Sequence, residues 1–223
     1  IISPLHPGKL YLKEGMTLLD IGCGWGYLLI EAAKKYGVKG YGCTLSKEQW
    51  KKGQERIEKM GLQDLVQIDL IDYRDLVAEG RQYDRIVSVG MLEHVGRSNY
   101  PLYMETASHL LKDGACSSSI TSVPRRKHRQ PVDAQIHLPG GTLPSLREIV
   151  SLAYDDDFQV IDVESLRRHY YKTLMCWFNN FQNVRDEVIA ARGEEFARMW
   201  DLYLCGCAVS FYIGNINIHQ ILM

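Results

Sequence analysis

Three glycines at single-residue spacing, Gly22, Gly24 and Gly26, follow a short apolar run that ends beside Asp20. Glycines at such a turn let the backbone bend sharply and approach a ligand closely. The spacing differs from the G-x-G-x-x-G of dinucleotide sites, and a carboxylate before the turn suits a cation better than a pyrophosphate. S-adenosylmethionine carries an ammonium group and a sulfonium but no phosphate. We therefore predict that this ligand binds at Asp20, Gly22, Cys23, Gly24 and Gly26; the alternative is a turn that only packs a helix on a strand.

Two later segments carry polar residues where further strands should end. Thr44 and Leu45 follow a second apolar run, and Gln49 comes one helical turn later. This group is placed to hold ribose hydroxyls, which an acidic residue does in many dinucleotide sites. Asp72 and Tyr73 follow the third apolar run, where the carboxylate of Asp72 could accept from an adenine amino group. Each residue alone is typical of a solvated loop or cap, but their order along the chain indicates an adenosine site.

The elements that position these residues follow from the hydrophobic pattern. Strands are predicted over residues 17–21, 39–44, 65–70, 83–89 and 115–122, with helices over 28–36, 46–60 and 100–111. Later in the chain we predict a helix from 145, a strand over 158–163, helices over 173–191 and 194–205, and one or more strands over 211–222. This alternation predicts a Rossmann-like α/β fold with a mostly parallel seven-stranded sheet and flanking helices.

The composition is that of a globular protein that binds no nucleic acid. The chain has 223 residues, 46% of them hydrophobic, and 26 basic against 27 acidic residues give a net charge of -1. No C-x-x-C pair occurs among the six cysteines, so reduced thiols are expected. The histidines show no metal-ligand spacing, and we predict no metal. Without a signal peptide or membrane span, a cytoplasmic protein is expected.

The chain is expected to form one domain, residues 1–223. Residues 9–122 form its cofactor-binding half, residues 123–205 supply a helical substrate-covering insertion, and residues 206–223 supply C-terminal strands. Periodicity is absent from residue 123 to residue 143, as expected of a functional loop. Arg125, Arg126, Lys127 and Arg129 within it are either a phospholipid headgroup contact or a solvated basic loop.

Several motifs together resemble the cyclopropane-fatty-acyl-phospholipid synthase family. They are residues 19–26, 44–49 and 72–76, the especially specific segment 84–96, and residues 143–149 and 173–175. The likeness extends from about Lys9 to the end, and the amino-terminal part of the family is missing from this sequence. It implies a class I methyltransferase that transfers a methyl group from S-adenosylmethionine to the cis double bond of an unsaturated acyl chain in a membrane phospholipid. The resulting carbocation then loses a proton and closes a cyclopropane ring.

The resemblance also implies a catalytic site, which this chain retains in part. Glu93 matches the family's glutamate, with His94 beside it, and the family's tyrosine is assigned to Phe178. In the family a glutamate, a cysteine, a histidine and a tyrosine hold a bicarbonate that collects the proton. Here the cysteine's segment lies upstream of the sequence, and residues 117–119 are serines at the histidine's position. A bicarbonate site would therefore be degraded.

The expected partner is unsaturated phospholipid at a bilayer surface, with the protein transiently at the inner face of the membrane and a homodimer left open. One alternative is a methyltransferase of the same fold that acts on another acyl chain or a small amine without ring closure. Another is a cofactor-binding module that has lost catalysis. A dehydrogenase is disfavoured by the glycine spacing.

Overall fold

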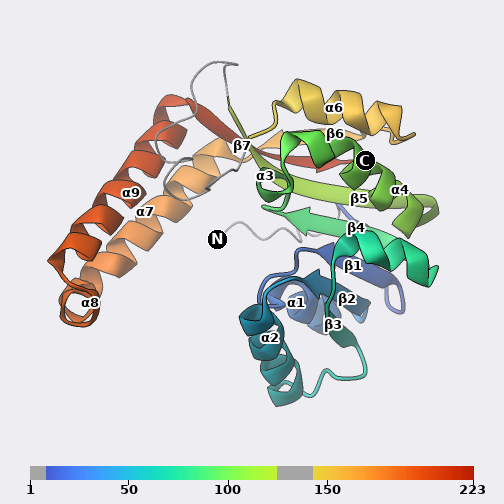
Figure 1. Ribbon diagram of the computed structural model, residues 1–223, viewed down its shortest axis with the longest axis horizontal. Helices are drawn as coiled ribbons and strands as arrows, with labels where there is room; N and C mark the ends of the chain where they lie inside the picture. Colours follow the sequence, from blue (N-terminus) through green and yellow to red (C-terminus); the bar gives the residue numbers. More distant parts are fainter. Residues whose placement is uncertain (1–8, 125–142) are drawn as a thin grey trace.

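The computed structural model, which describes residues 9–124 and 143–223, confirms the predicted α/β class (Figure 1). Its centre is a seven-stranded sheet in the order β3-β2-β1-β4-β5-β7-β6, in which only β7 runs against its neighbours. The strands are β1 Thr17–Ile21, β2 Lys39–Thr44, β3 Val66–Leu70, β4 Tyr83–Val89, β5 Leu111–Pro124, β6 Asp162–Ser165 and β7 Ile216–Leu222. The predicted mostly parallel sheet is therefore correct.

Helices cover both faces of this sheet because apolar residues point alternately to either side of its strands. Leu18 belongs to a buried cluster with α1 and α2, whereas the adjacent Leu19 belongs to a second cluster with η1, α4 and α6. The helices of the sheet region are α1 Tyr27–Tyr36, α2 Lys47–Lys59, η1 Tyr73–Glu79, α3 Leu92–Val95, η2 Arg97–Asn99, α4 Tyr100–Leu110 and α6 Leu146–Asp155. Ser46 caps α2 as expected, since its side chain accepts from the backbone of Gln49.

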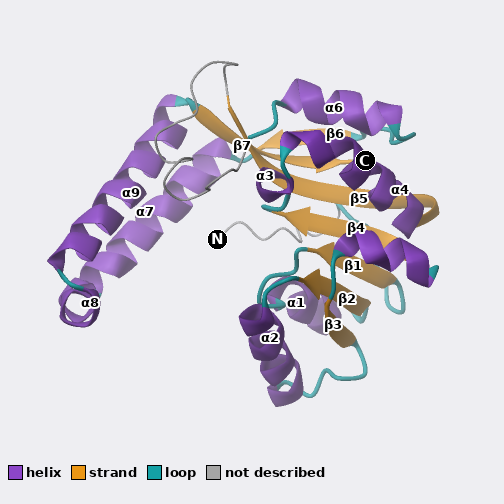
Figure 2. Cartoon of the chain, viewed as in Figure 1, coloured by secondary structure: helices purple, strands orange, loops and turns teal. Residues whose placement is uncertain are grey.

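Three further helices, α7 Arg167–Asn183, α8 Arg185–Arg192 and α9 Glu194–Ile213, form an arm beside the sheet. Figure 2 shows α7 and α9 side by side, extending away from the sheet, with α8 at the far end. A third apolar cluster holds the arm together and joins it to β7; it includes Leu174, Phe181, Leu204, Phe211 and Ile218.

Several predicted boundaries in the second half are wrong. The strand predicted over 158–163 corresponds to β6, which begins four residues later at Asp162 and ends two residues later at Ser165. Phe158 is buried in the core but lies before the strand. The helix predicted over 173–191 is two helices, because the chain leaves the helical conformation at Val184. The helix predicted to end at Cys205 continues to Ile213, and only Ile216–Leu222 is strand in the segment expected to hold C-terminal strands. Buried Leu204, Ala208 and Phe211 extend that helix, and Gly214, at a φ of 83°, ends it.

Residues 125–142, which hold the basic loop and most of the predicted lid loop, lie outside the described residues. The division of the chain into cofactor-binding and substrate-covering parts therefore stays a prediction. Within residues 9–124 and 143–223, no helix is both long enough and apolar enough to span a bilayer.

Candidate active site

A cleft of about 510 Å³ lies at the carboxyl ends of β1, β2 and β4. This edge is where open α/β sheets place their ligands, because the loops that leave the parallel strands meet there. The lining residues are Gly22, Gly24, Cys43, Thr44, Leu45, Ser46, Gln49, Ile71, Tyr73, Val89, Gly90, Met91 and His94. Seven of the thirteen residues predicted to bind or catalyse thus meet in one cavity: Gly22, Gly24, Thr44, Leu45, Gln49, Tyr73 and His94.

The glycine loop reaches the cleft because its backbone is fixed to β2. The amides of Gly22 and Cys23 both donate to the carbonyl of Cys43, at 3.2 and 3.1 Å. Gly22 and Gly24 have φ angles of 78° and 55°, a region that side chains strongly disfavour. No heavy atom lies within 4 Å of where a Cβ on Gly24 would be, so this glycine leaves space on the cleft side.

Polar groups at the end of β2 form a small closed network. Thr44 donates from its hydroxyl to Oε1 of Gln49 at 2.9 Å, and it accepts from the amide of Ser46 at 3.2 Å. The hydroxyl of Ser46 in turn accepts from the backbone N–H of Gln49 at 3.3 Å. The network fixes the position of the Gln49 side chain on the cleft wall, where its amide nitrogen can donate to a ligand.

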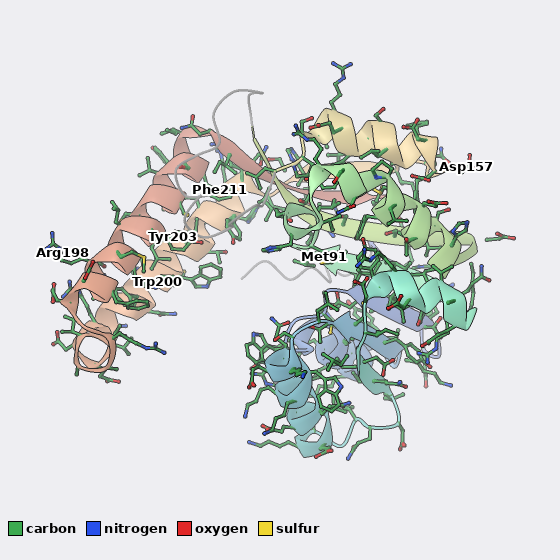
Figure 3. The ribbon with its side chains drawn as sticks, viewed as in Figure 1. Met91, Asp157, Arg198, Trp200, Tyr203 and Phe211 are labelled. Atoms are coloured by element: carbon green, nitrogen blue, oxygen red, sulfur yellow. The ribbon has the colours of Figure 1, made fainter. Side chains whose placement is uncertain are left out.

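The opposite wall was missed by the sequence reasoning, which gave no binding role to the residues directly after β4. Val89, Gly90 and Met91 line the cleft, and a Cβ added to Gly22 would lie 3.1 Å from the sulfur of Met91. Figure 3 shows Met91 near the centre of the molecule, between the sheet and α3. The signal was available, because residue 89 ends a parallel strand adjacent to β1 and its loop must reach the same edge.

Four residues predicted to bind the cofactor do not line the cleft. Cys23 and Gly26 serve packing: Cys23 is buried against Gly42, and a Cβ on Gly26 would lie 2.6 Å from Ile68. Asp20 is buried beneath the loop, where desolvation raises the pKa of its carboxyl to about 7.

Asp72 is the fourth of these residues. Its carboxylate accepts two hydrogen bonds from the guanidinium of Arg74, at 2.9 and 2.6 Å, and one from the Arg74 amide. These bonds lower the pKa of Asp72. The bidentate pair with Arg74 engages both carboxylate oxygens. The contact of Asp72 to adenine stays a prediction.

The residues predicted to catalyse come from two elements, Glu93 and His94 from α3 and Phe178 from α7. His94 lines the cleft, whereas Glu93 is buried on α3 and Phe178 is half-buried in the arm cluster. Tyr170 lies on α7, two turns before Phe178. Among the described arm residues, it is the one whose pKa is shifted in part by the charge of Glu93. Its pKa is raised mainly by burial, with smaller contributions from Cys207 and Glu93. Tyr170 therefore adds a phenol to the arm cluster, a group that the side chain of Phe178 lacks.

Aromatic rings surround Tyr170. Its ring centroid is 4.8 Å from that of Phe211 on α9 and 6.0 Å from that of Trp177, in a tilted and an edge-on arrangement. Figure 3 shows Phe211 on α9, nearer to the sheet than Trp200 and Tyr203. The base of the arm thus holds an apolar, π-rich group of rings.

The chemistry of the cleft lining excludes some ligands. None of its side chains, among the residues that the structure describes, is Lys, Arg, Asp or Glu. A pyrophosphate would find no cation there. Within the same residues, no group of three or more His, Cys, Asp or Glu side chains could hold a metal ion.

Comparison with known proteins names the family. A family model described as Mycolic acid cyclopropane synthetase matches residues 4–221. The chain belongs to this family. This membership confirms the resemblance found in the sequence. The relatives that match this chain are named after different lipids, which include fatty acids, phospholipids and mycolic acids. A probable fatty acid methyltransferase of Pseudomonas putida is 42% identical over 221 residues, which are 96% of this chain and 56% of that protein. The cyclopropane-fatty-acyl-phospholipid synthase of Escherichia coli K12 is 39% identical over 216 residues, 96% of this chain and 54% of that protein.

The chain spans about half the length of these two curated relatives. Among solved structures, the mycolic acid cyclopropane synthase CmaA1, crystallised with SAH and CTAB, superposes with a TM-score of 0.88 at 33% identity. The match covers 98% of this chain and 81% of that one. The synthetase family and its class I methyltransferase fold are thereby established for the described chain.

Proposed function

We propose that this protein transfers a methyl group from S-adenosylmethionine to the cis double bond of an unsaturated acyl chain in a membrane phospholipid, and that the product closes to a cyclopropane. The observation that carries the proposal is the cleft at the carboxyl ends of β1, β2 and β4. The glycine loop and the Thr44–Gln49 pair line it, and no described residue adds a Lys, Arg, Asp or Glu side chain to the lining. Family membership supplies the reaction class.

The described residues fit S-adenosylmethionine. A volume of about 510 Å³ lies within the range of sites for ligands of this size. Gly22 and Gly24 admit the amino-acid part of the ligand, and the buried carboxylate of Asp20 offers a negative charge beneath its ammonium group. Thr44 and Gln49 offer a hydroxyl and an amide to the ribose, and Ile71 and Tyr73 offer apolar surface to the adenine.

When bound, this ligand supplies an electrophilic methyl group on a sulfonium. The double bond of the acyl chain donates its π electrons to the methyl carbon, the bond from that carbon to sulfur breaks, and the sulfur leaves as a neutral thioether. The acyl chain is then a carbocation. A base takes one proton from the new methyl group, a role that we assign to the carboxylate of Glu93 among the described residues, and the electrons of that C–H bond close the ring.

Two groups on the acyl side can support the cation. The buried carboxylate of Glu93 stabilises positive charge near it, and this interaction is strong because water is largely excluded. The faces of Tyr170, Trp177 and Phe211 tolerate a cation without trapping it as a nucleophile would. We assign the acyl chain to the side of the cleft that faces Glu93 and the base of the arm.

Bicarbonate does not fit the described residues as they stand. At the position that the resemblance gives to the family's histidine, residues 117–119 are serines, and Phe178 stands at the position of its tyrosine. With these donors changed, fewer hydrogen bonds would hold the anion. We therefore derive no step through bicarbonate.

A second candidate product is a methylated chain without a ring. It is favoured by the same incomplete set of anion ligands and by the likeness to the probable fatty acid methyltransferase of Pseudomonas putida. In this case the carbocation loses its proton from the acyl chain rather than from the new methyl group.

Incubation with trideuteromethyl S-adenosylmethionine and vesicles of dioleoyl phosphatidylglycerol tests both candidates. Ring closure gives acyl chains with two deuterium atoms and the high-field proton signals of a cyclopropane. A product that retains three deuterium atoms would establish methylation without a ring. Cofactor binding with no label in any acyl chain would refute the lipid methyltransferase.

A further inference from the structure

The outer surface of the arm carries an apolar stripe whose position the proposed chemistry does not explain. Leu202, Val209 and Ile213 follow one line along α9 at spacings of seven and four residues, and their exposed fractions are 76%, 54% and 54%. Tyr212 flanks this line and is 67% exposed. We call these four residues the α9 patch. Exposed apolar residues elsewhere, such as Tyr154 and Ile161, are not aligned on one helix face.

A basic groove of about 490 Å³ adjoins the patch. It is lined by Arg167, Arg168, Tyr171, Lys172, Phe211 and Tyr212, and Tyr212 belongs to both surfaces. Among the residues that the structure describes, no Asp or Glu lines the groove. The rings of Tyr171 and Tyr212 lie 5.3 Å apart at its wall.

The three basic residues of the groove, Arg167, Arg168 and Lys172, differ in their contacts. Arg167 donates to the carbonyls of Phe211 and Tyr212, at 2.8 and 2.7 Å, and so stabilises the end of α9. Arg168 and Lys172 are exposed, and neither forms a salt bridge within the described residues. These two side chains are therefore available to an anionic partner.

From this juxtaposition we propose that the α9 patch and the basic groove dock the arm on an anionic phospholipid bilayer. A bilayer surface supplies acyl chains for the apolar side chains and phosphates for Arg168 and Lys172 in one layer. Helices that lie in the membrane interface combine these two features. Tyr171 and Tyr212 have the amphipathic rings that favour the headgroup level.

This inference rests on the proposed function, because it names the surface through which that reaction reaches its lipid. The arm also carries Tyr170 and Phe211, which we assign to the acyl side of the site. Docking through α9 would therefore hold the base of the arm close to the membrane that supplies the acyl chain.

The test is sedimentation of the full chain with vesicles of equimolar dioleoyl phosphatidylglycerol and dioleoyl phosphatidylcholine. Arg168→Glu with Lys172→Glu should weaken vesicle binding about tenfold or more, because each basic residue at such a surface contributes on this scale. Leu202→Gln with Val209→Gln and Ile213→Gln should weaken it similarly. The matched controls are Lys47→Glu with Lys51→Glu for charge and Tyr154→Gln with Ile161→Gln for exposed apolar area; both should bind as the parent does.

Three outcomes would overturn the proposal: unchanged binding by both arm variants, equal losses in the controls, or a concentration-dependent dimer that only the triple glutamine variant abolishes. The last outcome would mean that a second copy covers the patch. Methyl transfer to detergent-dispersed lipid distinguishes a failure of the docking proposal from a failure of the proposed function. Arm variants that keep this activity but lose vesicle binding support both, whereas patch-dependent vesicle binding without any methyl transfer would refute only the proposed function.

Discussion

The hydroxyl of Thr44 donates to Oε1 of Gln49 at 2.9 Å, a contact that joins the end of β2 to the first turn of α2. It places two residues that the sequence singled out on the same wall of the cleft. Because Thr44 occupies the amide oxygen, the nitrogen of Gln49 is the group that can reach a ribose hydroxyl. A side-chain amide can take two flipped orientations, and this hydrogen bond selects the one in which Oε1 of Gln49 faces Thr44.

Gln49→Ala should weaken binding of S-adenosylhomocysteine by about fivefold, since one hydrogen bond contributes roughly 1 kcal/mol. Titration calorimetry measures this directly. The matched control is Gln67→Ala, at an exposed position of β3 whose side chain bonds only to Asp69 among the described residues. Equal affinity in Gln49→Ala and the control would remove Gln49 from the site.

Gly24→Ala should weaken cofactor binding strongly while costing only about 1 kcal/mol of stability. Its Cβ meets no protein atom within 4 Å, so the added methyl would occupy ligand space. Gly114→Ala is the control, because it has a similar positive φ of 70° and an equally open Cβ position but lies outside the cleft. Denaturant unfolding should report similar losses for both variants, and only the first should lose affinity.

The contribution of Asp20 to stability without cofactor should fall as the pH rises from about 4 to about 7. Burial raises the pKa of Asp20 from 3.8 to about 7, so the folded protein binds a proton that the unfolded chain has already released. This contribution is complete below about pH 4 and is lost as the pH passes 7. The Tm of Asp20→Asn should therefore gain several degrees on the parent between pH 5 and pH 8.

Cofactor binding should show the opposite trend with pH. A cationic ligand above the loop favours the ionised carboxylate of Asp20, so affinity should increase between about pH 6 and pH 7.5. Asp20→Asn should remove this increase. An identical pH profile in the two proteins would separate Asp20 from the ligand's charge.

Tyr170→Phe should lower the rate of methyl transfer, by up to about a hundredfold if its phenol takes part in proton movement. Affinity for S-adenosylhomocysteine should stay unchanged, because Tyr170 does not line the cofactor cleft. Tyr171→Phe, one residue later and paired with Tyr212, is the matched control. A normal rate in Tyr170→Phe, together with a reduced rate in Phe178→Leu, would restore the assignment made from the sequence.

The sequence by itself determined the first half of the fold and one side of the site. Gly22, Thr44 and Gln49 follow strands whose local pattern is unambiguous, and parallel strands bring their carboxyl ends to one edge. For that reason the cleft could be predicted without coordinates. The arm could not, because its helix boundaries depend on where α7 and α9 bury Leu174, Phe181 and Phe211 against one another.

Only the tertiary structure decided which residues of that pattern touch the cleft. Cys23 and Gly26 belong to the same glycine motif as Gly24, yet both pack against neighbouring strands, a distinction that spacing does not contain. The pairing of Tyr170 with Phe211 was also beyond the sequence, because 41 residues separate them and the packing of α7 on α9 brings their ring centroids to 4.8 Å. Local spacing predicts which functional groups a turn or a strand end offers. Long-range packing decides which of those groups lie together in the site.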